Sequence, residues 1–479
     1  MQTNRKSAEG PRLGAARAAR RRAAYTAWLL ALAVCACACE KLPPNLVIVT
    51  LDTTRADHLG LYGYFRDTSP ALDAFGQNAI VFERAIVPMA TTLPTHTSLF
   101  TATQPLEHGV LANSTQGGSR FVPTPRIRLL AEAARDAGWR TAAFVSAAPL
   151  RRGSGLETGF ELFDEPSRSQ RDGEATTTAV LAWLERVLDE PFLLWVHYFD
   201  AHWPYTPPAP YATLFTTDAE LEASIAARHI PRSVYRPLVA ETEQTRASIN
   251  LYDGELRYQD AQLAKLLAAL EARPDWGRTV VLIAGDHGEG LGQHGEAAHG
   301  GTWDEQLHAP LLLRVPGEAS RRVAMPIAAV DVIPTLLGRL DAPGLEPLLA
   351  QASGHDVLAD GVRPLAILSQ DTGREREASE QRTSLTTQRW KLLRADLEGG
   401  GVRRMLFDLR ADPFELTDVS SLHPDVTDQL SAALAATLDA QRRKGAALRG
   451  GAPPATTLPD PALLEQLRAL GYIEDQSGR

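Results

Sequence analysis

Five short, largely apolar runs constrain the fold of this 479-residue chain more than any other feature of its sequence. The runs cover residues 46–51, 140–145, 192–198, 280–284 and 311–315. Runs of this length and composition are typical of parallel strands that are buried on both faces of a sheet. Helical patterns at residues 129–136 and 259–272 lie between the runs, so that strands alternate with helices. We therefore predict an α/β fold with a doubly wound, mostly parallel sheet flanked by helices.

Composition and pattern divide the chain into three predicted segments. Residues 1–39 are first basic, then apolar and then rich in cysteine, which is typical of an export leader. Residues 40–370 contain all five apolar runs and form the predicted main α/β domain. In residues 371–479 the pattern changes, because two strand-like runs flank a glycine-rich stretch and helical sequence follows. We expect this last segment to be a small α+β subdomain with a tail.

The leader holds all three cysteines of the chain, at positions 35, 37 and 39. The stretch Val34–Cys37 resembles a bacterial lipoprotein box with Cys37 as the lipid-bearing residue. We therefore predict export to the bacterial cell envelope and a lipid anchor in the membrane, with the body facing the periplasm or the exterior. Lipidation at Cys35 or Cys39, an uncleaved anchor and plain secretion are the alternatives. The remaining residues contain no cysteine, so the folded body has no disulfide, thiolate metal site or cysteine nucleophile.

The charge balance argues against nucleic acid as a partner. The chain has 49 lysine and arginine residues against 58 aspartate and glutamate residues, and its formal net charge is −9. Proteins that bind nucleic acid usually carry an excess of basic residues, which neutralise phosphates.

Acidic residues and histidines follow two of the apolar runs directly. Asp52 comes after residues 46–51, and the pair Asp286 and His287 comes just after residues 280–284. In open α/β sheets, ligands bind beyond the carboxyl ends of the strands. An adjacent Asp and His suit a divalent cation, and Asp52 can supply a third ligand. The sequence therefore predicts a metal site at this edge of the sheet, with a salt-bridged turn as the alternative.

A threonine-rich segment around Thr92 predicts the start of a helix. Pro94 favours the first helical turn, where its missing N–H costs nothing, and Thr92 is a natural N-cap. A hydroxyl at a helix N-terminus faces unpaired backbone N–H groups, which form a suitable site for a tetrahedral oxyanion. Simple capping of the helix is the alternative interpretation.

Four histidines concentrate after predicted strands, at positions 197, 202, 294 and 299. Glycine and proline surround them, and such a cluster fits anion contacts and proton transfer. Asp200 and His202, together with His299, are candidate ligands of a second metal. We favour one ion over two, because His202 also fits a substrate contact.

In order and spacing these clusters resemble the sulfatase family of the alkaline-phosphatase superfamily, from about Asn45 to about Pro413. The segment from Thr92 to Thr101 looks like the family's nucleophile signature, which normally carries a Cys or Ser that is oxidised to formylglycine. The resemblance makes residues 40–370 the catalytic domain. It also implies that His202 contacts the ester, that His299 lies near the leaving group, and that His96 stands where the signature has an arginine.

Departures from the family pattern favour different chemistry at the same site. The nucleophile position is Thr92, and formylglycine formation is not expected on a β-branched threonine. Ligation by Asp and His favours Zn²⁺ or Mn²⁺ over Ca²⁺. Threonine nucleophiles with such metals resemble the phosphodiesterases and phosphoryl-group transferases of the superfamily, in which the threonine is also a metal ligand.

The sequence therefore predicts a metal-dependent hydrolase of sulfate or phosphate esters with a covalent Thr92 intermediate. We lean to phosphate mono- and diesters. In this hypothesis His299 or His202 protonates the leaving group, and His96 with the helix N-terminus holds the non-bridging oxygens. The alternatives are a sulfatase that works without formylglycine, a phosphoryl-group transferase and a catalytically degenerate binding protein.

Overall fold

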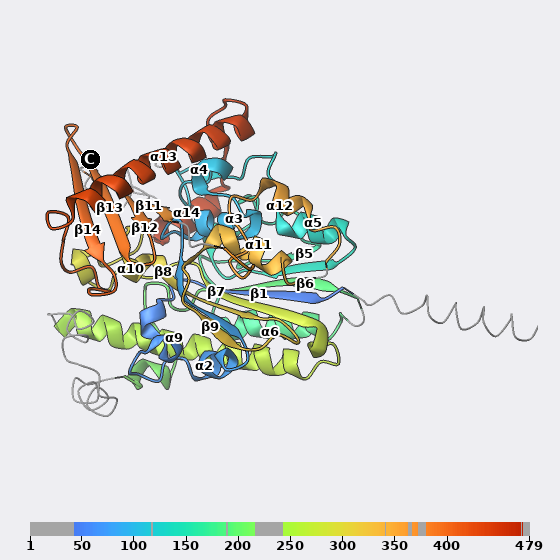
Figure 1. The fold of residues 1–479 in the computed structure, drawn as a ribbon. Coiled ribbons are helices and arrows are strands. Elements are labelled where there is room, and N and C mark those ends of the chain that lie inside the picture. Colours follow the sequence, from blue (N-terminus) through green and yellow to red (C-terminus); the bar gives the residue numbers. More distant parts are fainter. Residues whose placement is uncertain are drawn as a thin grey trace, which may run out of the picture. The chain divides into compact units, whose positions relative to one another are not determined.

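The apolar run at residues 46–51 forms β1 (Asn45–Leu51), a fully buried strand in the middle of a nine-stranded sheet (Figure 1). β1 pairs in parallel with β6 (Phe192–Tyr198) on one side and with β7 (Thr279–Gly285) on the other. Side chains of β1 alternate between two apolar clusters, because successive residues of a strand point to opposite faces. Both faces of the sheet are therefore covered, as the continuous apolar run predicts.

The computed structural model describes residues 43–115, 118–187, 190–215, 243–340, 342–362, 366–371, 380–470 and 472. The predicted leader, including Cys37, lies outside these residues. No helix within the described ranges combines the length and the apolar content that crossing a membrane requires.

The remaining strands of the main sheet are β2 (Ile80–Ile86), β4 (Arg140–Phe144), β5 (Leu162–Asp164), β8 (His308–Arg314), β9 (Arg321–Val323) and β10 (Ile327–Ala328). The order of strands across the sheet is β10-β2-β8-β7-β1-β6-β4-β5, and β9 pairs with β2. All five predicted runs are strands of this sheet, and the predicted α/β fold is confirmed.

One strand runs in the opposite direction to the prediction. We predicted a parallel strand at residues 311–315, but β8 is antiparallel to both β7 and β2. A parallel neighbour needs a crossover that returns the chain to the starting edge of the sheet. Between β7 and β8 the chain forms a 3₁₀ turn (Gln293–Gly295), the four-residue α10 (Asp304–Leu307) and irregular turns, so it re-enters the sheet from the edge at which it left.

Helices cover both faces of the sheet (Figure 1). One face carries α2 (Pro70–Gly76), α6 (Gly173–Leu184) and α9 (Glu243–Glu271). The other face carries α3 (Thr92–Thr101), α5 (Leu130–Asp136), α11 (Val332–Leu337) and α12 (Pro347–Gln351). The helices predicted at residues 129–136 and 259–272 are present, and the second is the end of the much longer α9.

A second, antiparallel sheet follows along the chain. Its strands are β11 (Ile367–Gln370), β12 (Glu380–Thr386), β13 (Trp390–Leu397) and β14 (Val402–Asp408). Helix α13 (Pro424–Arg449) packs on this sheet, with its leucines in the shared core. The first strand begins ahead of the predicted boundary at residue 371, and residues 44–479 form one compact unit. The division at 371 therefore stays a prediction.

Further elements in the described part of the chain are α4 (Pro105–His108), β3 (Arg120–Phe121), β15 (Thr456–Thr457), α14 (Pro461–Ala469) and several 3₁₀ helices of three residues each. β3 and β15 pair with each other, although they lie far apart in the sequence.

A buried lysine connects the second sheet to the main domain. The Nζ atom of Lys391 in β13 lies 2.8 Å from Asp304 Oδ1 and 2.7 Å from Glu415 Oε1, and the lysine side chain has no exposed surface. Arg84 pairs with the other carboxylate oxygen of Asp304. Buried charges of this kind are stable only when each has its partners.

We predict that Lys391→Met lowers the free energy of unfolding by about 3–5 kcal/mol, because it leaves the carboxylate of Glu415 buried without its cation. Urea titration followed by circular dichroism measures this change. Arg404→Ala is the matched control, since its pair with Asp428 is exposed and is worth less than about 1 kcal/mol. Equal unfolding midpoints for the two variants would show that Lys391 does not stabilise the contact between the sheets.

Candidate active site

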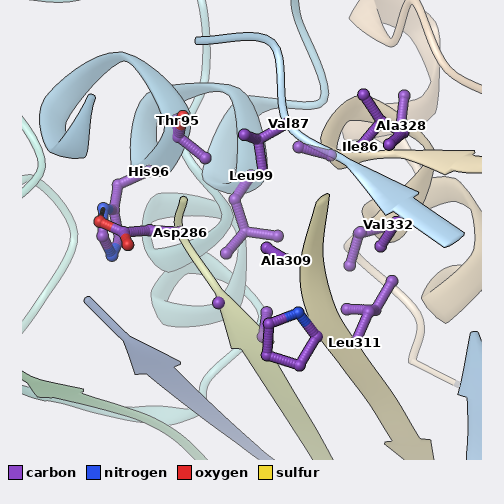
Figure 2. Close-up of a pocket in the computed structure, with 15 residues that line it drawn as sticks. Ile86, Val87, Thr95, His96, Leu99, Asp286, Ala309, Leu311, Ala328 and Val332 are labelled. Carbon is purple, nitrogen blue, oxygen red and sulfur yellow. Dashed lines mark ion pairs between the residues drawn. The ribbon is translucent and has the colours of Figure 1, made fainter. Parts of the chain in front are cut away.

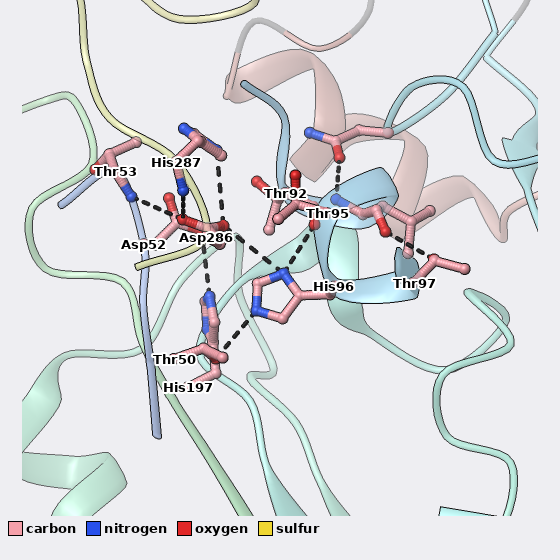
Figure 3. Close-up of polar contacts among 12 residues, drawn as sticks. Thr50, Asp52, Thr53, Thr92, Thr95, His96, Thr97, His197, Asp286 and His287 are labelled. Carbon is pink, nitrogen blue, oxygen red and sulfur yellow. Dashed lines mark hydrogen bonds and ion pairs between the residues drawn. The ribbon is translucent and has the colours of Figure 1, made fainter. Parts of the chain in front are cut away.

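The ends of three parallel strands bring the predicted metal ligands together. Leu51 of β1 is in register with Gly285 of β7 and with Tyr198 of β6. The residues that follow β1 and β7 therefore leave the sheet side by side. Asp52 N donates to Tyr198 O at 2.9 Å, and Asp286 N donates to Leu51 O at 3.2 Å. Figure 3 shows Asp52, Asp286 and His287 converging at this edge.

Several buried atoms at this edge have no hydrogen-bond partner of standard geometry among the described residues. They include Asp52 Oδ1, Asp286 Oδ2, His287 Nε2 and Thr92 Oγ1. Ligand atoms of Asp52, Asp286 and His287 all lie within 4.8 Å of one another. A buried polar atom without a partner is costly, and so a cluster of them indicates a missing ligand. The set contains carboxylate, imidazole and hydroxyl groups, and it fits a divalent cation.

Hydrogen bonds orient the free atoms toward one another. His287 Nδ1 donates to Gly288 O at 2.9 Å, which leaves the Nε2 lone pair free, 3.6 Å from Asp286 Oδ2. Asp286 Oδ1 accepts from the backbone N–H groups of Thr53 and His287. A metal-binding histidine usually donates its second ring N–H to a carbonyl in this way.

Electrostatics at this edge also favour a cation. Burial raises the pKa of Asp52 and Asp286 well above the usual value, and the nearby Asp52 charge raises that of Asp286 further. Burial lowers the pKa of His287 well below its usual value, so its ring is neutral. Two carboxylates and a neutral imidazole need a positive charge among them if both acids are to ionise.

A second group of ligand-type residues lies beneath the first but does not fit a metal. His96, His197 and Asp286 have ligand atoms within 4.8 Å of one another. His197 Nε2 lies 3.2 Å from Asp52 Oδ2, and His197 Nδ1 accepts from Ser146 N. The ring nitrogens of His197 are therefore already engaged with protein groups. We therefore infer that His96 and His197 support Asp52 and Asp286 and do not themselves bind a metal. Figure 3 shows the two rings beside these carboxylates.

The placement of His96 differs from its predicted role. His96 Nδ1 donates to Thr92 O at 2.8 Å, and its Nε2 lies 3.0 Å from Thr50 Oγ1. Trp195 Nε1 donates to the same Thr50 hydroxyl, which leaves that hydroxyl free to donate to His96. Both ring nitrogens of His96 are thus occupied below the site. In this structure His96 therefore has no free ring nitrogen for the non-bridging oxygens of a substrate, which we predicted it to hold, and it contacts the backbone of Thr92 instead.

Thr92 is the first residue of α3 and is not its N-cap. The N-cap is Thr91, which has an extended backbone (φ −156°, ψ 134°) and makes no side-chain capping bond. The prediction was one residue off, because adjacent threonines offer two equivalent caps. Thr92 is fully buried and belongs to the first helical turn, where unpaired N–H groups and the positive dipole end favour an anion.

His202 and His299 lie next to each other near the candidate metal ligands. Their Nε2 atoms lie 3.3 Å apart. His202 Nδ1 donates to Trp203 O at 2.6 Å, and His299 Nδ1 donates to Ala90 O at 3.0 Å. Burial lowers the pKa of His202 to about 3 and that of His299 to about 4. The ring centroids of His287 and His299 are 4.4 Å apart, so His202 and His299 lie beside the candidate metal ligands.

Asp200 does not join His202. Its Oδ1 accepts a hydrogen bond from the N–H of Gly173, the first residue of α6, at 2.8 Å. Burial raises the pKa of Asp200 to about 7. Within the described ranges, neither group of three clustered metal-type residues contains it. The structure therefore does not support the predicted second metal site of Asp200 and His202.

Two residues of this site were not predicted from the sequence. Asn113 Oδ1 accepts from Leu93 N at 2.8 Å, and the Asn113 Nδ2 amide is buried without a partner among the described residues. Tyr472 OH lies 2.9 Å from His202 Nε2. Neither residue belongs to a strand end or a spacing pattern, so the sequence carried no signal for them.

The cavity drawn in Figure 2 is not the substrate site. It has a volume of about 30 Å³ and lies behind α3, where Leu99 and Val332 form much of its wall. This volume holds water molecules but no ester. His96 and Asp286 border one side of this cavity, so the candidate metal ligands lie next to the apolar core.

Known proteins are similar to this chain in sequence and in fold. The family model named Sulfatase matches residues 44–342. Arylsulfatase K of Mus musculus is 27% identical over 279 residues, which cover 56% of this chain and 46% of that protein. The phosphonate monoester hydrolase of Agrobacterium radiobacter superposes with a TM-score of 0.65 at 21% identity, covering 83% of this chain and 96% of that chain. A structure from work on glycosaminoglycan metabolism by Bacteroides thetaiotaomicron gives 0.68 at 19% identity, covering 89% and 99%.

What these matches show about the chain depends on their coverage and on their sequence identity. The chain spans about half the length of arylsulfatase K. The structural likenesses are at 21% identity or below and establish the shared fold. One fold serves many reactions, so the activity must be argued from the site.

We predict that His287→Ala abolishes tight binding of a divalent metal. Its Nε2 is a ligand atom, so its loss costs more than the roughly 10- to 100-fold typical of losing an outer hydrogen-bond partner. Elemental analysis after dialysis against Zn²⁺ or Mn²⁺ measures the bound metal. His355→Ala is the control, because His355 pairs with Asp331 away from the cluster. Full metal content in the His287 variant would remove this residue from the ligand set.

Proposed function

This chain belongs to the sulfatase family, and from that premise we propose that it is a metal-dependent hydrolase of sulfate or phosphate esters. In this proposal Thr92 is the nucleophile and carries a covalent intermediate, and phosphate mono- and diesters are the preferred substrates. One observation carries the proposal: the Thr92 hydroxyl is one of the buried atoms at the candidate metal centre that have no hydrogen-bond partner of standard geometry. A hydroxyl in that position is both a ligand and a nucleophile.

The residues fit one divalent ion, Zn²⁺ or Mn²⁺ in preference to Ca²⁺, because imidazole is a poor ligand for Ca²⁺. Asp52, Asp286, His287 and Thr92 would hold it. When bound, such an ion supplies positive charge that lowers the pKa of the coordinated hydroxyl and stabilises charge on the ester.

The covalent step follows from the position of Thr92. Its Oγ1 attacks phosphorus or sulfur, and the bond to Oγ1 forms as the bond to the leaving-group oxygen breaks. The Nε2 lone pair of His299 or His202 accepts the Thr92 proton and passes it to the leaving oxygen. Water then attacks the Thr92 ester, which releases phosphate or sulfate and restores the hydroxyl.

Other residues hold the reacting groups. The Nδ2 amide of Asn113 is fixed through Leu93 at the start of α3, and it can donate to a non-bridging oxygen together with the helix N-terminus. His96 donates to the Thr92 carbonyl and so fixes the backbone of the nucleophile. Both contacts place donors before the substrate arrives, which lowers the cost of reorganisation.

The chemistry of threonine supports the preference for phosphate. Thr92 carries a methyl group on Cβ, so its oxidation gives a ketone and not the aldehyde of formylglycine. An unmodified hydroxyl beside an Asp-His metal centre suits phosphoryl transfer. The second candidate is a sulfatase that works without formylglycine, and the likeness to arylsulfatase K favours it.

We predict that the metal-loaded protein turns over aryl phosphate mono- or diesters with Zn²⁺ or Mn²⁺ and that Thr92→Ala reduces this rate by at least about 10³-fold. The loss of a nucleophile removes the covalent route and leaves only residual binding and electrostatic effects. Rates on aryl phosphate monoester, phosphate diester and sulfate, measured with each metal in turn, test this prediction.

The same panel contains the results that would contradict it. Faster turnover of the aryl sulfate would establish the second candidate. Undiminished turnover by Thr92→Ala, with unchanged metal content, would exclude Thr92 from the mechanism. A wild-type protein that binds neither metal would favour a degenerate binding protein.

We also propose that the protein is anchored to a membrane of the bacterial envelope through a lipid on Cys37. The basic and apolar leader and the stretch Val34–Cys37 support this proposal. Cys37→Ala is expected to move the protein from the membrane fraction to the soluble fraction, because a single thioether anchor is lost. Immunoblots of the two fractions measure the shift. Retention of the variant in the membrane fraction would instead indicate anchoring through Cys35, Cys39 or an uncleaved leader.

A further inference from the structure

Helix α14 brings a tyrosine from far along the chain to the candidate active site. Asp460 caps the helix by accepting from Leu463 N at 2.9 Å. Leucines of α14 and Tyr472 pack on the loops that follow two strands of the main sheet, in one apolar cluster with Ala147, Ala148 and Phe199. The described residues of this segment therefore pack against loops next to the candidate site.

The backbone of Tyr472 is held at both of its polar groups. Its N–H donates to Leu467 O at 2.9 Å, and its carbonyl accepts from Ser114 Oγ at 3.1 Å. The side chain is 9% exposed, so the ring is buried as well. This anchoring directs the hydroxyl inward, where the tyrosine ring lies near the rings of His202 and His299.

The hydrogen bond at the end of this side chain has a defined direction. His202 Nδ1 already donates to Trp203 O, so His202 Nε2 carries a lone pair. Tyr472 OH lies 2.9 Å from that nitrogen and is therefore the donor. His299 Nε2 also carries a lone pair, because His299 Nδ1 donates to Ala90 O. The phenol O–H of Tyr472 is thus a hydrogen-bond donor, and the Nε2 atoms of the two histidines beside it are acceptors.

We propose that Tyr472 is a catalytic residue: when an ester is bound at the point that His202 and His299 face, Tyr472 donates to the leaving-group oxygen the hydrogen bond that it otherwise donates to His202 Nε2. This inference rests on the proposed function. Negative charge develops on that oxygen as its bond breaks, and a placed donor stabilises it.

A competing interpretation is that Tyr472 only covers the site. Thr92 is fully buried, and the ring of Tyr472 lies near the rings of His202 and His299. The two interpretations predict opposite effects when the hydroxyl is removed and the ring is kept. A covering role predicts equal or faster turnover, whereas a donor role predicts slower turnover that depends on the leaving group.

The experiment compares wild type with Tyr472→Phe, using the full chain loaded with metal and the ester class that wild type hydrolyses best. Two esters are used, one with 4-nitrophenol and one with an alkyl alcohol as the leaving group. We expect kcat to fall roughly 10- to 100-fold on the alkyl ester, in line with loss of a hydrogen bond to a charged oxygen, and little on the nitrophenyl ester. Tyr62→Phe is the matched control, since that hydroxyl bonds to Phe82 O and Leu311 N in the body of the sheet.

A second measurement does not depend on turnover. The ¹⁵N resonance of His202 Nε2, assigned by its loss in His202→Asn, should move in Tyr472→Phe and stay in place in Tyr62→Phe. Equal losses on both esters would assign Tyr472 a structural role, and unchanged or faster rates would assign it a covering role; either result overturns the proposal. If wild type hydrolyses neither ester, the proposed function fails, and the resonance still reports whether the contact exists.

Discussion

The position of β1 between β6 and β7 is the constraint on which the candidate site depends. Parallel strands in register end at the same edge, and so the residues after them are neighbours in space although they are distant in sequence. Asp52 and Asp286 meet for this reason, and His197 on β6 reaches the Asp52 carboxylate. A slip of one residue in either pairing would turn these side chains to the opposite face of the sheet. The site therefore depends on the same apolar pattern that stabilises the fold.

Placing such a site at a buried edge is unfavourable unless the rest of the structure compensates. Two carboxylates and a hydroxyl are buried there with unpartnered atoms, and each costs free energy until a ligand binds. Thr53 adds backbone strain, because a β-branched residue rarely adopts a positive φ of 46°. Its N–H donates to Asp286, and Tyr252 donates to its carbonyl, so two hydrogen bonds hold this conformation. Unpaired polar atoms and local strain are together typical of a functional site in an otherwise well-packed protein.

Five histidines lie close to this edge, and their hydrogen bonds divide them into two roles. In His96 and His197 both ring nitrogens contact protein groups, and these two residues support the site from below. The other three, His202, His287 and His299, each donate Nδ1 to a backbone carbonyl and direct Nε2 toward the site. The carbonyl partner fixes the same Nδ1–H tautomer in His96 as in these three, so the surroundings of Nε2 decide whether such a histidine supports the site or faces a ligand.

The sequence by itself determined the layered α/β fold, the strand-end residues Asp52, Asp286 and His287, and the helix that begins at Thr92. These features follow from local patterns: apolar runs specify buried strands, polar residues after them mark the ligand edge, and proline with threonine marks a helix start. Only the tertiary structure decided the direction of β8, the inward placement of His96, the separation of Asp200 from His202, and the arrival of Asn113 and Tyr472. Those features depend on contacts between distant residues: Tyr472 and His202 are 270 positions apart, and no local pattern encodes such a contact.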